Sequence, residues 1–400
     1  MKPTFTYILQ SLIGLALATN LSLVADDNLI RLGDNGPQLK RTVIDEQLPG
    51  AYQVEIADVN GDGSPDIVAL GGGTVAWYQN PGWSKHIVSH SGITPGVIST
   101  ATADIDGDGK AEIAIAYEFE MNQPRKGQLL LARQDEGSWT FEKLGAFPSI
   151  HRLRWGDFNG DRKRDLLIAP IFGETATAPK FQEQGADLTV LFSADPQEKS
   201  HVDRKLVTHA VCVIHAQDNP QNTFLCSSNE GVWRYWFENQ KWMSRKLFAG
   251  ASGERPKTGS SEIHQGHFAD GRVFYTTIEP WHGTNVVLTA EKTRQSDNFQ
   301  QPVTLDNSLV DGHALCVADI DGDGTDEIFA GFRGAGTSVR AYRLDSGVWK
   351  TFVIDSRIAA QDLRSADING DGLADVVSVG GSTKNVVLYE SVRKSQQKQE

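Results

Sequence analysis

The stretch that decides the fold is STATADIDGDGKAEIAIAY, residues 99–117. Asp104, Asp106, Asp108 and Glu112 occupy positions 1, 3, 5 and 9 of a turn between two segments that alternate like β-strands. Carboxylates this close repel one another unless a cation neutralises them, and oxygen ligands at alternate positions are typical of Ca²⁺ sites. The intervening glycines permit the positive φ values that so tight a turn needs. We therefore expect a Ca²⁺-binding turn that joins two strands.

The same nine-residue pattern occurs five times in the chain. Surface turns that were rich in Asp and Gly only for solubility would not keep this phase. We therefore predict up to five structural Ca²⁺ sites, with the ligands Asp58, Asn60, Asp62, Asp66, Asp104, Asp106, Asp108, Glu112, Asp157, Asn159, Asp161, Asp165, Asp319, Asp321, Asp323, Glu327, Asp367, Asn369, Asp371 and Asp375.

The spacing of the acidic turns gives the number of repeats. Their first aspartates are separated by 46, 53, 162 and 48 residues. The long gap holds three periods, so two further units lack the acidic turn and the total is seven. A period near fifty residues is typical of a β-propeller, in which each repeat is one four-stranded blade.

A second repeated segment, an apolar outer strand, occurs before the first acidic turn as QLKRTVIDE, residues 38–46, whereas the last repeat is one strand short. The N-terminal strand is thus expected to complete the last blade and remove its open edge. We predict an all-β, seven-bladed propeller over residues 26–395, followed by a tail at 393–400. The expected blades are 46–90, 91–147, 148–209, 210–250, 251–305, 306–355, and 356–392 together with 36–45.

Residues 1–25 read as a secretory signal, with Lys2 before an apolar run, and predict a periplasmic or secreted protein. A membrane anchor is the alternative, although Asn20 and Ser22 interrupt the run. The formal net charge of −13 comes largely from the acidic turns, so neither nucleic acid nor an anionic membrane is an expected partner. Of three cysteines, Cys212 and Cys226 could pair, and Cys316 is expected to be a buried small hydrophobe.

The acidic turns join the first strand of a blade to the second, so all of them lie on one face of the ring. The candidate site is expected on the opposite face, where the innermost strands begin. Six residues before each first aspartate come Tyr52, Ile98, His151, His313 and Gln361, and His215 and Glu262 are assigned to the two units without acidic turns. Second strands end near Glu118, Glu120, Glu230, Glu279, Trp281, His282 and Arg333. Imidazoles that converge on one channel mouth could hold a divalent metal. We predict His151, His215 and His313 as ligands and interpret His201, His209, His264 and His267 as strand or surface residues.

The acidic turns resemble the FG-GAP/VCBS repeat class. The segments HRLRWGDFNGDRKRDLLIAPIFG, SSEIHQGHF, TIEPWHGTNVVL, DGHALCVADIDGDGTDEIFAGFRG and QDLRSADINGDGLADVVSVGGSTKNVVLY are similar to the propeller of the aldos-2-ulose dehydratase/isomerase family. His264 stands where a lysine is expected, and Arg162 replaces a turn glycine. The resemblance implies a metal-dependent dehydratase that acts by β-elimination on a keto-sugar such as 1,5-anhydrofructose or a 3-keto-glycoside. Because no cupin segment follows the propeller, isomerisation is not expected.

This mechanism assigns roles within the candidate site. The metal, which could be Zn, Mn, Mg or Ca, polarises the ketone, a base removes the neighbouring proton, and hydroxide leaves with acid assistance. The expected catalytic residues are Glu262, Glu279, His282 and Tyr52. The expected sugar-binding residues are Trp281, Arg152, Arg333 and Glu230.

Two other functions stay open from the sequence. A polysaccharide lyase for uronate-containing glycans uses the same elimination, and Arg152, Arg154 and Arg333 could neutralise its substrate's carboxylate. A non-catalytic propeller that binds a glycan or a protein is the second alternative. Several histidines at one repeat phase favour an enzyme, because a binding module does not need them.

Overall fold

The computed structural model of the protein describes residues 28–135, 137–216, 219–296 and 298–393. The predicted signal segment at 1–25 and the tail from residue 394 onward lie outside these residues. In the part of the chain that is described, no helix is long and apolar enough to cross a membrane.

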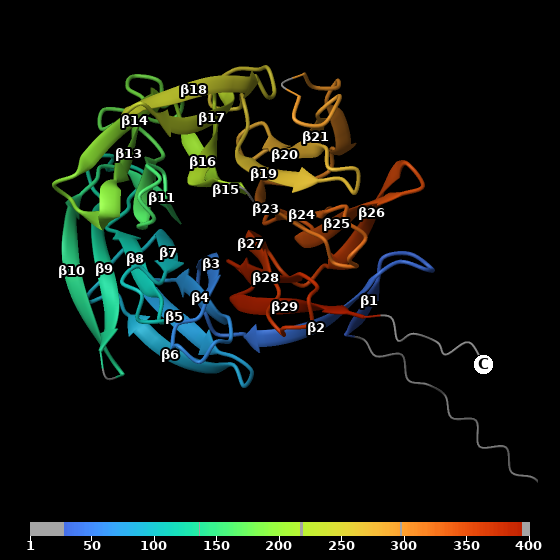
Figure 1. Cartoon of the computed structure of the whole chain (residues 1–400), viewed down its shortest axis with the longest axis horizontal. Coiled ribbons are helices and arrows are strands. Elements are labelled where there is room, and N and C mark those ends of the chain that lie inside the picture. Colours follow the sequence, from blue (N-terminus) through green and yellow to red (C-terminus); the bar gives the residue numbers. More distant parts are fainter. Residues whose placement is uncertain (1–27, 136, 217–218, 297, 394–400) are drawn as a thin grey trace, which may run out of the picture.

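Seven antiparallel sheets stand around a central channel, which confirms the predicted seven-bladed propeller (Figure 1). Blade 1 comprises β3 (Ala51–Ala57), β4 (Asp66–Gly71), β5 (Thr74–Gln79) and β6 (Ser84–Ser89); blade 2 comprises β7 (Ser99–Ala103), β8 (Glu112–Tyr117), β9 (Gln128–Asp135) and β10 (Ser138–Ala146). Blade 3 comprises β11 (Ile150–Gly156), β12 (Asp165–Pro170), β13 (Ala186–Leu191), the short 3₁₀ turn η1 (Phe192–Ala194) and β14 (Lys199–Lys205). Blade 4 comprises β15 (Thr208–Ala216), β16 (Asn219–Ser228), β17 (Gly231–Glu238) and β18 (Lys241–Phe248).

Blade 5 comprises β19 (Glu262–His267), β20 (Val273–Glu279), β21 (Asn285–Ala290) and β22 (Val303–Asp306). Blade 6 comprises β23 (Gly312–Ala318), β24 (Glu327–Phe332), β25 (Ser338–Asp345) and β26 (Val348–Asp355). Blade 7 comprises β27 (Ala360–Ala366), β28 (Asp375–Gly380), β29 (Asn385–Val392), β2 (Gln38–Asp45) and the short edge strand β1 (Leu29–Arg31).

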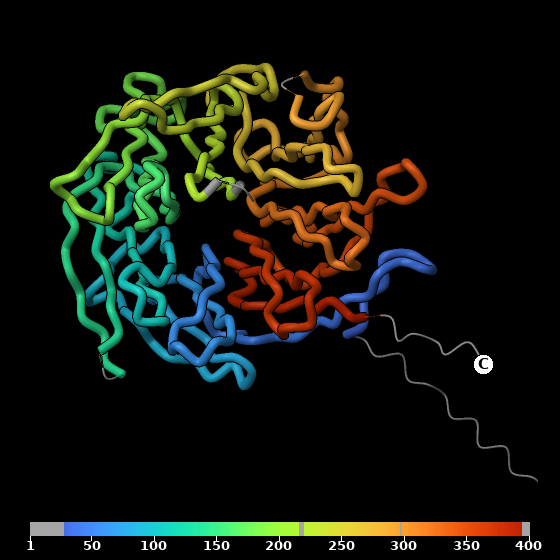
Figure 2. Tube along the Cα trace, viewed as in Figure 1, coloured from blue at the N-terminus to red at the C-terminus, as the bar shows by residue number. Residues whose placement is uncertain are grey.

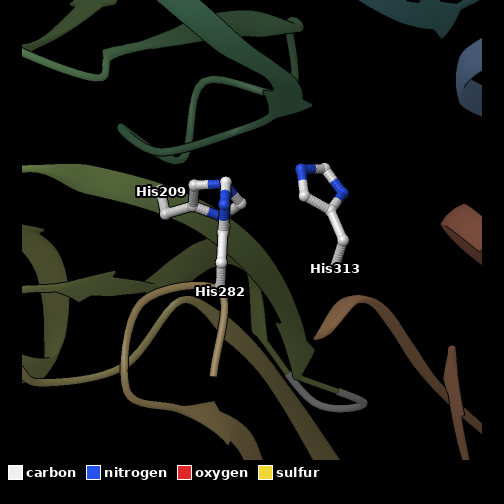
Figure 3. Close-up of side chains that lie close together, drawn as sticks. All are labelled: His209, His282 and His313. Carbon is white, nitrogen blue, oxygen red and sulfur yellow. The ribbon is translucent and has the colours of Figure 1, made fainter. Parts of the chain in front are cut away.

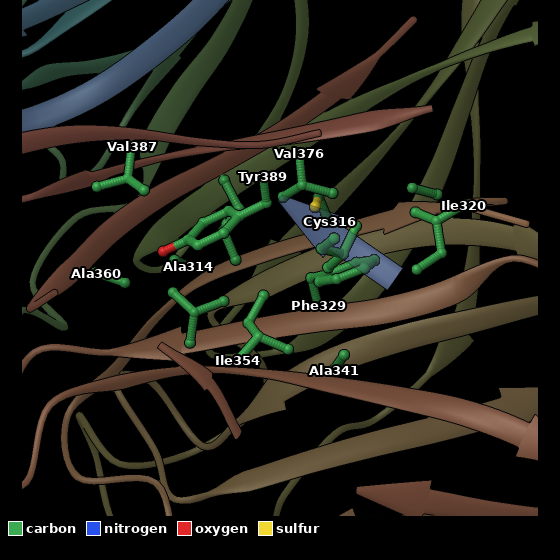
Figure 4. Packing of buried hydrophobic residues seen from close by; sticks show 14 of the residues in the cluster. Ala314, Cys316, Ile320, Phe329, Ala341, Ile354, Ala360, Val376, Val387 and Tyr389 are labelled. Carbon is green, nitrogen blue, oxygen red and sulfur yellow. The ribbon is translucent and has the colours of Figure 1, made fainter. Parts of the chain in front are cut away.

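The hydrophobic core lies between neighbouring blades. All six residues of β8 are buried, whereas most residues of the outer strand β10 are exposed or half-buried. Figure 4 shows one such cluster, in which Phe329 of blade 6 packs near Val376 and Tyr389 of blade 7. Burial of each large side chain of this kind contributes roughly 1.5–3 kcal/mol to folding. Each blade therefore depends on its neighbours for stability.

The N-terminal strand lies beside the C-terminal one. β2 pairs with β29 from Gln38↔Val392 onward, so that the blue and red ends of the chain share blade 7 (Figures 1 and 2). Thr42 Oγ1 also donates a hydrogen bond to Glu390 Oε2 at 3.2 Å. Strands from both ends of the chain thus build one sheet.

Four blades are joined to the preceding blade by a buried tyrosine, an arrangement that we call a Tyr–Asp latch. In each latch, a tyrosine hydroxyl from the third strand donates to an aspartate at or near the end of the preceding blade's outer strand. A Lys or Arg side chain contacts the same carboxylate. The pairs are Tyr78–Asp45, Tyr235–Asp203, Tyr342–Asp306 and Tyr389–Asp355, at 2.6, 2.9, 2.8 and 3.0 Å. Burial and then the adjacent carboxylate raise the pKa of each tyrosine, which keeps the hydroxyl protonated as a donor.

The five acidic turns share one geometry. In the first, Asp58 accepts hydrogen bonds from Gly61 N and Gly63 N, both at 2.7 Å, and Asp66 accepts one from Val59 N at 3.1 Å. The other four turns repeat these contacts. Arg162 has a φ of +70° where the other turns have glycine, a conformation that favours glycine.

The cysteine prediction is wrong in one respect. Cys212, Cys226 and Cys316 are all free thiols. Cys226 lies opposite Val211 in the β15–β16 ladder and packs toward blade 3, whereas Cys212 packs toward blade 5. Because adjacent residues of a strand point to opposite faces, the two sulfur atoms cannot meet.

Candidate active site at the channel mouth

Five inner strands carry a β-bulge at the same place. The register shifts across Tyr52, His151, His209, His313 and Gln361, each of which is the second residue of its strand. A bulge leaves one residue unpaired and re-aims its side chain, and such irregularities are common next to active sites. The bulges of blades 1, 3, 4, 6 and 7 therefore direct a tyrosine, three histidines and a glutamine to one end of the channel.

Three histidines from different blades form the centre of this site. One ring nitrogen each of His209, His282 and His313 lies within 4.8 Å of the others. His209 and His282 bring their Nε2 atoms to 2.9 Å, and His313 faces them across a gap (Figure 3). His209 and His313 come from β15 and β23, and His282 comes from the loop between β20 and β21. The three rings thus present nitrogen atoms to a common point.

Each of these three rings has an oxygen atom behind it. His209 Nδ1 lies 2.8 Å from Glu262 Oε1, His282 Nδ1 lies 3.3 Å from Asp311 Oδ1, and His313 Nδ1 lies 2.6 Å from the Gln361 carbonyl oxygen. Metal-binding histidines commonly contact a carboxylate or carbonyl through the nitrogen that does not bind the metal. The arrangement fits a three-histidine metal site.

One of these three contacts is incomplete in hydrogen-bonding terms. His209 Nδ1 and Glu262 Oε1 are buried and, despite their short separation, form no hydrogen bond of ordinary geometry with any described residue. His151 Nδ1 is in the same state. Buried polar atoms without partners are costly and are typical of a site built for a ligand.

The rings of the site are held neutral. Burial lowers the pKa of His209 and His313 well below the usual range, and neighbouring guanidinium groups lower it further. Burial also lowers the pKa of His282 to about 3, against the opposing effect of Asp311. Burial raises the pKa of Glu262 to about 7. Neutral imidazole is the form that binds metals.

A second cluster adjoins the three histidines. Tyr52 Oη lies 3.0 Å from His151 Nε2 and 3.4 Å from His313 Nε2. Arg152 Nη1 lies 3.5 Å from the same hydroxyl and 3.2 Å from His151 Nε2, and its guanidinium stands over the Tyr52 ring. Burial and the Arg152 charge lower the pKa of His151. This cluster can exchange a proton between a phenol and a neutral imidazole.

The loop that carries His282 is fixed from two sides. Arg333 donates to Asp311 Oδ2 at 2.8 Å and to Gln361 Oε1 at 2.9 Å, and its Nη2 lies 3.1 Å from His282 Nδ1. Lys257 Nζ donates to the His282 carbonyl at 3.3 Å. His282 has a φ of +47°, which is uncommon for a residue with a side chain, and these contacts hold it there.

Other predicted site residues do not belong to the three-histidine cluster, although the centroid of the Trp281 ring lies 5.0 Å from that of His282 and 6.4 Å from that of His209. Glu279 is buried and accepts hydrogen bonds from Ser260 and Thr277 within blade 5, and burial raises its pKa. Trp281 packs edge-on against Phe172 and Phe181 and is only 7% exposed, so it supports the loops rather than forming an open wall. Ile98 is 8% exposed just before β7, and Glu230 lies between β16 and β17. Glu118 and Glu120 lie in the loop between β8 and β9, where Glu120 pairs with Lys126.

His215 does not lie at the channel mouth, which corrects its predicted place. It is exposed near the far end of β15, where its Nδ1 lies 3.0 Å from Asn222 Nδ2. His209 takes the expected place at the other end of the same strand; it was predicted to be a strand or surface residue outside the site, and it is a buried strand residue within the site. The sequence reading placed His209 in the outer strand of blade 3, but β14 ends at Lys205. His209 is six residues before His215, the spacing that separates His151 from Asp157, and this was the available signal.

A group of charged side chains follows the site residues along the inner strands β3, β11 and β27. Arg154 and Arg364 both contact Glu55 Oε1, at 3.1 and 3.4 Å, and Arg364 also donates to Asp362 Oδ1 at 2.8 Å. His264 of β19 is half-buried, and its pKa is lowered to about 3, first by burial and then by these two arginines. His201 and His267, which were also predicted to be strand or surface residues, are exposed and lie beside aspartates.

The chain was compared with known proteins. Residues 127–292 match the family model described as the aldos-2-ulose dehydratase β-propeller domain, and residues 47–115 match the FG-GAP-like repeat. The resemblance predicted from the motifs is confirmed. A curated relative, aldos-2-ulose dehydratase of Phanerodontia chrysosporium, is 26% identical over 228 residues, which is 50% of this chain and 24% of that protein. Residues 127–292, which match the dehydratase propeller model, include His151, His209, Glu262 and His282.

A solved structure with a TM-score just above 0.5 has a similar fold at low sequence identity. The extracellular domain of the hybrid two-component system BT4673 from B. thetaiotaomicron aligns with a TM-score of 0.52 at 13% identity, over 86% of this chain and 39% of that one. The exotype rhamnogalacturonan lyase YesX aligns with a TM-score of 0.47 at 11% identity, over 93% and 75% of the two chains. At these identities the likeness concerns the fold alone.

Proposed function

We propose that the protein is a carbohydrate lyase that dehydrates a keto-sugar by β-elimination at the channel mouth. The observation that supports this most is the convergence of His209, His282 and His313, each backed by an oxygen atom and next to the Tyr52–His151 pair. The similarity of residues 127–292 to a dehydratase propeller supports the same reaction class.

A divalent metal is part of this proposal, and the residues present fit one. His209, His282 and His313 would hold it, which replaces the predicted set of His151, His215 and His313. When bound, the metal polarises the keto oxygen of the sugar and so acidifies the neighbouring C–H group. Three protein ligands leave positions open for substrate oxygens, as in catalytic zinc sites.

The protein's own groups then move the proton. Tyr52 Oη takes up the proton from the carbon next to the ketone while His151 Nε2, 3.0 Å away, accepts the phenol proton. The C–O bond at the β carbon breaks, and the same pair returns the proton to the departing hydroxide. The products are water and an unsaturated ketone. Arg152 Nη1, 3.5 Å from Tyr52 Oη, stabilises negative charge on the phenol oxygen during the transfer.

The test is the turnover of 1,5-anhydrofructose and of 3-keto-glycosides, followed by the ultraviolet absorbance of the unsaturated ketone. We expect His313→Ala to lose roughly a hundredfold or more in turnover and to lose bound metal. His215→Ala is the matched control, because the same side chain is removed from the opposite end of an inner strand. Equal activity of the two variants would refute the proposed site.

A lyase for uronate-containing glycans is a second candidate. It is favoured by Arg152 and Arg333, two guanidinium groups that flank the histidines and could neutralise a carboxylate. Elimination from a uronate also gives an ultraviolet-absorbing product. Oligogalacturonate in the same assay therefore distinguishes the two substrates, and turnover of neither would favour a non-catalytic binding propeller.

We also propose that the acidic turns bind Ca²⁺. In two of them, carboxylate oxygens of three residues lie within 4.8 Å of one another: Asp104, Asp106 and Asp108, and Asp319, Asp321 and Glu327. Burial and the neighbouring carboxylates raise the pKa of Glu327 to about 8. A divalent cation would offset this repulsion. Export to the periplasm or the medium, where Ca²⁺ is abundant, stays part of the proposal.

A further inference from the structure

We propose a second ligand site on blade 4, away from the channel, that binds an acidic saccharide. The site is a cleft of ≈520 Å³ whose lining includes Arg234, Trp236, Arg245 and Thr223. Its volume falls within the range of small-molecule sites, about 300–1,000 Å³. The inference does not rest on the reaction proposed for the channel.

The cleft exists because blade 5 covers only part of blade 4. Leu225 and Val232 pack against Ile263 and Tyr275 of blade 5. Further along the same face the cover ends, because β22 has only four residues and pairs only with 286–288 of β21. The strands β16, β17 and β18 are longer, with ten, eight and eight residues. One end of this blade face is therefore left open.

The open end has the chemistry of a site for a ring that carries a negative charge. Arg234 and Arg245 are direct cross-strand partners in the β17–β18 ladder. Both residues line the cleft, so two guanidinium groups stand side by side where a carboxylate of the ligand can accept hydrogen bonds from them. Trp236, two residues from Arg234 on the same face, provides an aromatic surface. Thr223, which lies beside Trp236 on the cleft, has a buried hydroxyl oxygen with no hydrogen-bond partner among the described residues.

The charge of this hairpin contrasts with the rest of the chain. Residues 231–248 contain four Lys or Arg and one Glu, although the whole chain has a net charge of −13. The single acid, Glu238, lies 3.3 Å from Trp236 Nε1 at the cleft. A carboxylate there can accept hydrogen bonds from sugar hydroxyls, which a uronate saccharide carries on every ring and a DNA backbone lacks. These features favour an acidic saccharide over an oligonucleotide.

The experiment is titration calorimetry of the full chain with tetragalacturonate at low and moderate salt. We expect measurable binding that weakens with salt, because the guanidinium groups are partly exposed. Arg234→Gln and Trp236→Leu should each weaken binding by about tenfold or more. Arg31→Gln, which removes an exposed arginine from β1, and His313→Ala in the channel should bind like the parent. Melting temperatures show whether each variant is folded. If Arg234→Gln does not fold, Arg234→Lys takes its place in the titration.

Several outcomes would overturn the proposal. These are no binding by the parent, unchanged binding by the folded Arg234 variant, and a loss as large in Arg31→Gln or in His313→Ala. Equal binding of neutral maltotetraose would exclude the role of the charge, and equal competition by sodium sulfate would exclude the role of the sugar. If a thymidine dodecamer bound more tightly than tetragalacturonate, the ligand of the cleft would be a nucleic acid and not a saccharide. Failure in the channel assay with success here would leave this inference intact.

Discussion

At the scale of single residues, the site depends on one unpaired position per inner strand. The bulges at Tyr52, His151, His209, His313 and Gln361 turn side chains that would otherwise alternate between blade faces. Ring symmetry then brings positions of very different sequence number to one point. Asp311 and Glu262 complete the site by orienting two of the rings.

Asp311 gives the first prediction at this scale. Asp311→Asn keeps the shape of the side chain but removes the charge that faces His282 Nδ1 and Arg333 Nε. We expect the affinity for the channel metal to fall about 10–100-fold, since such outer partners fix ring orientation. Competition with a metal chelator measures the affinity. Asp326→Asn, beside the exposed His267, is the control and should leave the affinity unchanged.

Much of this site could be predicted from the sequence, because the acidic turns set the phase. Counting back six residues from each turn located Tyr52, His151 and His313. In blade 4 the acidic turn is absent, so the phase of the inner strand had to come from the six-residue spacing between His209 and His215 alone, and His215 was chosen in place of His209. Asp311 lies in the segment before β23, where no repeat phase applies, and only the folded ring brings it beside His282.

At the scale of elements, the Tyr–Asp latches join the outer part of one blade to the third strand of the next. They are a further repeated feature, besides the acidic turns and the outer strands, and they were not predicted from the sequence. The reason is that each latch joins residues of different blades, and a period within one blade does not show such a pair. The latch at Asp355 is the most buried, and its ion pair with Arg41 holds β2 against blade 6.

We expect Asp355→Asn to destabilise the protein by about 3–5 kcal/mol, because it leaves Arg41 buried without its partner. Burial disfavours the charged Asp355, but hydrogen bonds from Arg41 and the Arg357 backbone outweigh it and lower the pKa below 3.8. The contribution is therefore complete above the unfolded-state pKa of about 3.9 and is lost as the pH falls through the lower folded-state value. Urea unfolding should show a constant difference between the proteins from pH 5 to 8 that shrinks below about pH 4.

Asp345→Asn is the comparison variant for this test, because Asp345 pairs with Lys350 at the surface. It should leave the free energy of unfolding nearly unchanged, because a solvent-exposed ion pair contributes little. A similar effect of both substitutions would show that burial of the Asp355 pair does not matter.

Removal of β2 tests the closure of blade 7. Deletion of residues 38–46 takes away the partner of β29 and leaves its backbone groups exposed along a long edge. We expect aggregation or a large loss of soluble protein, measured by size-exclusion chromatography. Deletion of 28–31, which removes only the short edge strand β1, should be tolerated far better. A soluble, monomeric protein of unchanged stability after the longer deletion would contradict this view of closure.

At the scale of the whole molecule, the predictable part of the fold was the number of blades. A fixed period and a recurrent turn suffice for that count, because every blade must pack on its neighbours. The partial cover of blade 4 by blade 5 could not be foreseen in the same way. The extent of this cover depends on the residue at which β22 ends, and the repeat period does not predict where a strand ends.

The acidic turns also act at this scale, since they lie in five of the seven blades. Removing Ca²⁺ with a chelator should lower the melting temperature, because an ion that binds only the folded state stabilises it by mass action, about 2.7 kcal/mol per site at a hundredfold excess over Kd. Asp104→Ala should lower it in Ca²⁺ while leaving turnover of keto-sugars unchanged. Identical melting curves in Ca²⁺ and in chelator would exclude the proposed ions.

The shared blade has a consequence for how the protein is made. Thr42 and Glu390, which meet in blade 7, are 348 positions apart. A ribosome adds some 5–20 residues per second, so β2 must wait on the order of tens of seconds for β29 to be synthesised. Six blades can assemble during this time, but the strand that is made first takes its place last. Until then β2 at the start of the chain has no partner strand. Anything that keeps β2 from pairing with other chains during synthesis therefore lowers the risk of aggregation.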